Sequence, residues 1–151
     1  MEWMVLPLRR YAEFTGRSRR KEFWMFALLN IIATIVITFL LLAFGLPFAA
    51  MGDTSQMASV VSGGAITAVM LLAGLWALAV FIPSIAVAVR RLHDRDLSGW
   101  WYLGVVIASF VPLIGFLASI AFLVVTLLPG TPGPNRFGPD PKDPAQSSVF
   151  A

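Results

Sequence analysis

The sequence predicts an all-helical integral membrane protein: a bundle of three apolar helical segments preceded by an interfacial helix. The first observation is composition, because 58% of the 151 residues are hydrophobic and 13% are charged, whereas about a quarter of a soluble domain is charged. The second observation is where the charged residues lie along the chain. No charged residue occurs in 23–52, 54–89 or 97–135, and each run exceeds the ~20 apolar residues that cross a bilayer as a helix.

Residues 1–22 are predicted to lie in the membrane interface. They carry six of the eleven basic residues, and the larger apolar side chains recur at three- and four-residue steps with one break at Pro7. That spacing favours a short amphipathic helix at headgroup level, and the alternative is a flexible basic leader. A secretory signal peptide is excluded because the apolar block that follows, 23–44, is longer than the 7–15 residues of such a peptide.

The first span is predicted at 23–45, with Trp24 at its entry. Asn30, Thr34 and Thr38 share one face of this helix because they are four residues apart. In hydrocarbon a polar stripe is expected to turn toward neighbouring helices and form hydrogen bonds with them. The alternative for the two threonines is a bond back to their own helix.

The second span is predicted at 65–89, after a loop at 46–63 that contains no Lys or Arg. Ala73 and Ala77 provide a small-residue face for close helix packing. Nine basic residues lie in 1–22 and 90–98, on the other side of these two spans. The positive-inside rule therefore places the N-terminus and the 90–98 loop in the cytoplasm.

The third apolar block, 100–128, is too long for one straight span and contains Pro112 near its centre. One kinked span is favoured, because each half of a hairpin would have only about 12 residues and ~17 are needed to cross unaided. The alternative is a hairpin, which gives four helices. Gly104 and Ala108 provide a packing face in either case.

The block ends in a Gly/Pro-rich tail at 129–144, which is predicted to be irregular, and 145–151 are expected to be a disordered end. Residues 1–144 are therefore expected to form a single membrane domain.

Few residues could carry chemistry. The span interiors lack ionisable side chains, which argues against a proton-coupled transporter. His93 is the only histidine, its neighbouring candidate ligands are all carboxylates, and the chain has no cysteine. A stable metal site needs three or four ligands. We therefore expect no metal, no cofactor and no assigned catalytic residue.

Arginines gather before the first span and after the second, with Glu22, Asp94 and Asp96 among them. Acidic residues contribute little to orientation, so their presence indicates salt-bridged, fixed arginines. Such a layer can hold an anionic lipid headgroup or another phosphate-bearing ligand, and the alternative is that the arginines only orient the chain. The residues expected at the binding site are Arg17, Arg20, Glu22, Arg90, Arg91, His93, Asp94, Asn135, Arg136 and Asp140.

Three motifs resemble a known family. They are FTGRSRRKEFW at 14–24, RRLHD at 90–94 with SGWW at 98–101, and GTPGPNRFGPDP at 130–141. Together they resemble the small bacterial inner-membrane proteins catalogued as domain of unknown function 805, over about residues 8–142. The resemblance implies a plasma-membrane protein with several helical spans and no established activity, and it assigns no catalytic residue. This chain departs from the family pattern after His-Asp, where it reads Arg95-Asp96-Leu97.

The expected function is a non-enzymatic module whose charged layer binds anionic membrane lipid or a partner protein, without nucleic acid. One alternative is an enzyme on a lipid-linked or phosphorylated substrate, with His93 as general base oriented by Asp94. That enzyme would need Asn135, Arg136 or Asp140 beside His93. Another alternative is a small subunit of a transport complex, and a homo-oligomer is also open.

Overall fold

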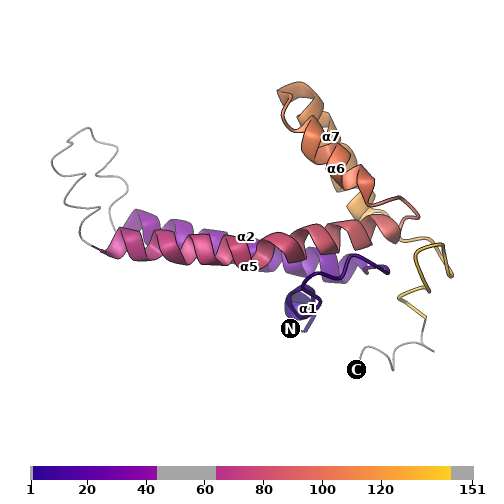
Figure 1. The fold of residues 1–151 in the computed structure, drawn as a ribbon, viewed down its shortest axis with the longest axis horizontal. Coiled ribbons are helices and arrows are strands. Elements are labelled where there is room, and N and C mark those ends of the chain that lie inside the picture. Colours follow the sequence, from indigo (N-terminus) through magenta and orange to yellow (C-terminus); the bar gives the residue numbers. More distant parts are fainter. Residues whose placement is uncertain (1, 44–63, 144–151) are drawn as a thin grey trace. The chain divides into compact units, whose positions relative to one another are not determined.

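The computed structural model describes residues 2–43 and 64–143, and within them the regular structure is helical apart from one isolated bridge between Asn135 and Gly138. The all-helical prediction is confirmed for this part of the chain. The expected loop at 46–63 and the expected disordered end at 145–151 lie outside the described residues. The helices are α1 (Glu2–Arg9), α2 (Arg20–Ala43), α5 (Ala65–His93), α6 (Trp100–Ala108) and α7 (Pro112–Leu127) (Figure 1).

Two helices are long and apolar enough to cross a membrane, α2 and the Ile66–His93 part of α5. Only 6% of the most apolar stretch of α2 and 22% of that of α5 is buried, whereas the core helix of a soluble protein is mostly buried. Large apolar side chains such as Phe39 and Leu78 stay exposed along them. Exposure of this kind suits contact with lipid.

The chain divides into two compact units, Ala27–Phe81 and the combination of Met1–Phe26 with Ile82–Ala151. The first unit holds most of α2 and the first part of α5. In it the hydroxyl of Thr34 donates to the carbonyl of Asn30 at 2.8 Å, which is the bond within the helix that the sequence left open. Thr38 and Ala77 are exposed. The predicted contacts of this face with other helices stay predictions.

The second unit has a small core with many polar members. Its buried apolar residues are few, among them Phe26 of α2, Val87 and Leu92 of α5, and Pro7 of α1. Of the residues that the structure describes, seven polar or charged ones are buried, and all lie in this unit: Arg17, Ser18, Glu22, Arg90, Arg91, Asp94 and Thr126. Charged side chains are almost never fully buried unless they are paired. Their contacts therefore define the region of interest.

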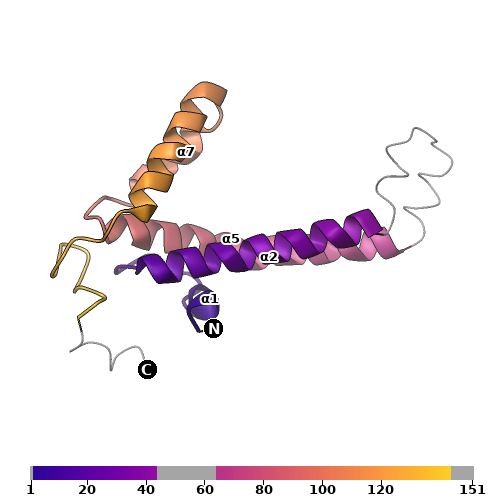
Figure 2. The same ribbon diagram turned by 180° about the vertical axis from the view of Figure 1, so that it is seen from behind.

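The preference for one kinked span across 100–128 is wrong. Helix α6 ends at Ala108, Val111 is extended (φ −110°, ψ 111°), and α7 starts at Pro112. The physical reason is that a residue before proline avoids helical angles, while proline itself suits the first position of a helix. Helices α6 and α7 pack side by side in both views (Figures 1 and 2). The block is a helical hairpin.

The N-terminal helix is shorter than the predicted interfacial segment, because α1 ends at Arg9. The chain then turns before α2, and Gly16 adopts a positive φ of 81°, which glycine accepts without strain. Trp3 of α1 lies 5.6 Å under the guanidinium carbon of Arg19 in a cation–π contact. This contact ties α1 to the segment that enters α2.

Candidate functional site

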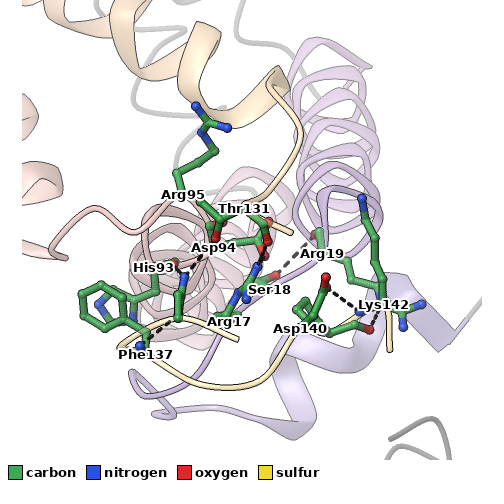
Figure 3. Close-up of polar contacts among 12 residues, drawn as sticks. Arg17, Ser18, Arg19, His93, Asp94, Arg95, Thr131, Phe137, Asp140 and Lys142 are labelled. Atoms are coloured by element: carbon green, nitrogen blue, oxygen red, sulfur yellow. Dashed lines mark hydrogen bonds and ion pairs between the residues drawn. The ribbon is translucent and has the colours of Figure 1, made fainter. Parts of the chain in front are cut away.

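Asp94 is the centre of the buried charges (Figure 3). Its Oδ1 lies 3.0 Å from Nη2 of Arg17, and its Oδ2 pairs with Nη1 of Arg91. The three side chains are 4%, 1% and 0% exposed, respectively. Arg91 precedes Asp94 by three residues at the end of α5, whereas Arg17 comes from the segment before α2. One carboxylate thus joins two guanidinium groups by charge-assisted bonds from two parts of the chain.

The remaining donors of Arg17 hold the Gly/Pro-rich tail. Nη1 donates to the carbonyl of Gly133 and Nη2 to that of Thr131, both at 2.6 Å. The backbone N–H of Thr131 donates in turn to the carbonyl of Asp94 at 2.8 Å. Gly130 packs so closely that a Cβ there would overlap the carboxylate of Asp94. The tail is therefore folded onto the end of α5.

Arginines also hold the C-terminal end of α7. A helix leaves its last four carbonyl groups unpaired, and this end carries partial negative charge. Here the last two carbonyls of α7 and the next two along the chain accept bonds from three guanidinium groups. The bonds run from Arg91 Nε and Nη2 to Thr126 (3.1 and 3.0 Å), from Arg20 Nη1 to Leu127 (3.1 Å), from Arg91 Nη2 to Leu128, and from Arg95 Nη1 to Pro129 (2.5 Å).

A second buried pair joins Arg90 to Glu22. Nη1 of Arg90 lies 3.0 Å from Oε1 of Glu22, and the two side chains are 0% and 4% exposed. This contact is an ion pair without hydrogen-bond geometry, and no acceptor among the described residues reaches Nε or Nη2 of Arg90. Buried donors without partners are costly. The second pair is therefore held less completely than the first.

We call these five side chains, Arg17, Glu22, Arg90, Arg91 and Asp94, the charged cluster. It contains three guanidinium groups and two carboxylates, so it carries one net positive charge. The salt-bridged arginines that the sequence indicated are confirmed. The structure also shows that the donors of Arg17 and Arg91 face carboxylates and backbone carbonyls of the chain itself.

His93 lies next to the charged cluster but is not bonded to it. Its Nδ1 is 3.1 Å from the carbonyl of Gly16, so Nδ1 carries the proton and donates. Its ring stacks on Phe137 with centroids 3.9 Å apart and an interplanar angle of 4°. Asn135 donates from Nδ2 to the His93 carbonyl at 2.9 Å. The alternative in which Asp94 orients His93 is wrong, because Nδ1 of His93 donates to the carbonyl of Gly16 while the carboxylate of Asp94 pairs with two arginines.

The other two tail residues of the predicted site lie toward solvent. Nε of Arg136 pairs with Oδ1 of Asp96 at 3.1 Å, with side chains 62% and 49% exposed. Asp140 accepts backbone N–H bonds from Lys142 at 2.9 Å and Gly133 at 3.1 Å, which shapes the tail (Figure 3). These bonds, chiefly that from Lys142, lower the pKa of Asp140. The tail is thus an ordered turn.

The structure brings the ten predicted site residues into one compact unit. Sequence reasoning missed the backbone acceptors, which are the carbonyls of Thr131 and Gly133 and those at 126–129. Every residue type carries a backbone carbonyl, so the sequence does not indicate which of them accept these bonds. It also missed Phe137, for which an aromatic residue in a Gly/Pro-rich tail was the available signal. Among the described residues, no group of three His, Asp or Glu side chains could hold a metal ion.

The two glycines of the hairpin, one in each helix, differ in how closely they are packed. A Cβ on Gly104 would meet nothing within 4 Å, whereas a Cβ on Gly115 of α7 would lie 2.6 Å from the Cα of Ser109. Gly115 is therefore the close-approach position of the hairpin, and Gly104 is open in this structure.

Two apolar helices of spanning length, joined to a charged cluster at one end, define a helical membrane protein. The chain belongs to the family described as "Protein of unknown function (DUF805)", whose model matches residues 11–139. It is 42% identical to the inner membrane protein YhaH of Escherichia coli K12 over 142 residues, 94% of this chain and 98% of the relative. It is 39% identical to the inner membrane protein YhaI of the same strain over 144 residues, 94% of this chain and 97% of the relative. No solved structure gives a significant match.

Proposed function

We propose that this protein is a non-enzymatic module of the bacterial inner membrane that binds anionic lipid headgroups. The observation that carries the proposal is the division of its basic residues. Arg17, Arg90 and Arg91 are buried and face partners within the chain. Arg9 and Lys21 are exposed on either side of the turn between α1 and α2. The buried set forms the scaffold, and the exposed set meets the headgroups.

The surroundings of the exposed pair support a lipid surface as the ligand. Helix α1 is amphipathic, with Arg9 in its last turn and Trp3 held by Arg19. An amphipathic helix with basic and aromatic residues lies in the interface of an anionic membrane. Nine basic residues in 1–22 and 90–98, against none in 46–63, support a cytoplasmic location for the N-terminus and for the 90–98 loop.

The test is binding of a fluorescent anionic phospholipid to the purified full chain in zwitterionic nanodiscs. The double variant Arg9→Gln/Lys21→Gln should weaken binding, at most roughly thirtyfold, since a basic residue near an anionic surface contributes about 1 kcal/mol. The matched control is Lys142→Gln, which removes an exposed cation from the tail and should leave binding unchanged. Equal binding by the double variant and the control would refute the proposal. Arg17 and Arg91 are unsuitable probes because their replacement removes a partner of Asp94.

One observation favours the enzyme as a second candidate: Asn135 lies beside His93, as a composite site requires, and donates to its backbone carbonyl. With the proton on Nδ1, Nε2 of His93 is the nitrogen that would act as general base. Hydrolysis of a lipid-linked phosphate by the purified protein, abolished in His93→Gln and retained in Arg9→Gln/Lys21→Gln, would establish this candidate over the binding module.

A further inference from the structure

The hairpin of α6 and α7 exposes apolar side chains on all its sides. The buried residues of the two helices are only Gly115 and Thr126, and no charged residue occurs between Leu97 and Asn135. The largest exposed side chains are Trp100, Trp101, Ile107, Phe110, Leu113 and Phe116. An apolar surface of this extent needs an apolar partner.

The N–H groups of the turn between α6 and α7 are paired within the hairpin. The N–H groups of Ser109, Phe110 and Val111 donate to carbonyls of the last turn of α6 at 3.0–3.2 Å, and Pro112 has no N–H. The hydroxyl of Ser109 donates to the carbonyl of Val106 at 2.6 Å. Irregular backbone exposed to lipid is otherwise not tolerated, because hydrocarbon offers no hydrogen-bond partner. The pairing of these N–H groups lowers the cost of placing the turn in hydrocarbon, and Phe110 at its apex, which is 83% exposed, presents an apolar ring.

Both legs of the hairpin are fixed near the end of α5, beside the charged cluster. Gly99, just before α6, packs against Val89 so closely that a Cβ there would lie 2.6 Å from a methyl carbon of that side chain. The end of α7 is held by Arg91 and Arg20 through its last carbonyls. The chain therefore enters and leaves the hairpin at the same place.

The hairpin is shorter than the hydrocarbon core. The 16 residues of α7 rise about 24 Å and the nine of α6 about 13 Å, at 1.5 Å per residue. The hydrocarbon core is ~30 Å thick. With its base at the charged cluster, the tip falls short of the far headgroups.

We propose that α6 and α7 form a re-entrant hairpin that enters and leaves the hydrocarbon by the membrane face at which the charged cluster lies. Its tip ends inside the hydrocarbon, and the partner of its exposed surface is the acyl chains of the lipid. This inference does not rest on headgroup binding, because neither Arg9 nor Lys21 belongs to the hairpin.

The first experiment uses the absence of native cysteine. Single cysteines replace Ser98, Phe110 and Lys142 in the full chain, and vesicles of both orientations are treated with an impermeant and then a permeant maleimide. The impermeant reagent should label positions 98 and 142 from the same side and position 110 from neither, while the permeant reagent labels all three. Labelling of position 110 from either side by the impermeant reagent would overturn the proposal, and so would labelling of 98 and 142 from opposite sides.

The second experiment identifies the partner. A fluorophore on Phe110→Cys should be quenched at least twofold more than one on Ser98→Cys by lipids that carry a nitroxide deep in the acyl chain. Disulfide-linked dimers at position 110 without such quenching would show that a second copy covers the tip, and would overturn the proposal. Leu113→Cys, 71% exposed on α7, gives a second labelling site if Phe110→Cys does not fold.

Discussion

Replacing Asp94 by Asn tests whether the charged cluster holds the second unit together. The substitution keeps the size of the side chain and one acceptor oxygen, but it removes the negative charge shared by Arg17 and Arg91. The net charge of the cluster rises from one to two in a site where the guanidinium groups are 0–1% exposed. Breaking a buried ion pair in this way costs about 3–5 kcal/mol.

The assay is unfolding of the purified protein in nanodiscs, followed by near-ultraviolet circular dichroism, with limited proteolysis of the tail in parallel. Asp94→Asn should lower the unfolding free energy by about 3–5 kcal/mol and should expose the tail to cleavage, because the Arg17 bonds to Thr131 and Gly133 lose their anchor. The control is Asp96→Asn, which breaks only an exposed pair with Arg136 and should cost about 0–1 kcal/mol.

A double-mutant cycle sharpens the result. If Asp94 and Arg17 act as one pair, Arg17→Gln with Asp94→Asn should be less destabilised than the sum of the single variants, by about 1–3 kcal/mol. The reasoning is refuted if Asp94→Asn unfolds with the same free energy as Asp96→Asn, or if the two single effects simply add.

Three further predictions concern the tail and the hairpin. Gly130→Ala should destabilise the protein by about 1–3 kcal/mol in the same unfolding assay, because its Cβ overlaps Asp94, whereas Gly104→Ala should be neutral or stabilising in open helix. The lowered pKa of Asp140 stabilises the tail above the pKa of the unfolded chain, and this contribution is lost as pH falls through the folded value. The protection factors of the amides in the tail, corrected for the intrinsic exchange rate at each pH, should therefore fall on acidification in the parent chain, and Asp140→Asn should remove that pH dependence. Arg95→Gln should cost about 0.3–1 kcal/mol in thermal unfolding, because it removes one cation from the C-terminal end of α7.

The helices and the ion pairs were predictable because each depends on residue types that can be read from the sequence. Charge-free runs predict the apolar helices, and the acids Glu22 and Asp94 among arginines predict salt bridges. The hairpin was misjudged because its legs were assumed to be equal and to need a full crossing, whereas α6 and α7 have nine and 16 residues. The contacts of the tail were not predictable, because Arg17 and Arg91 bind carbonyl oxygens that every residue type carries.

The order of synthesis sets when Arg17 can acquire all of its partners. Arg17 leaves the ribosome 116 residues ahead of Gly133, one of the carbonyls that it binds. Until the tail emerges, two acceptors of this guanidinium group, the carbonyls of Thr131 and Gly133, do not yet exist, so the donors that face them must stay hydrated. A chain released before Thr131 would keep Asp94 as the partner of Arg17 but would lack both carbonyls of the tail. Emergence of the tail thus completes the bonding of Arg17.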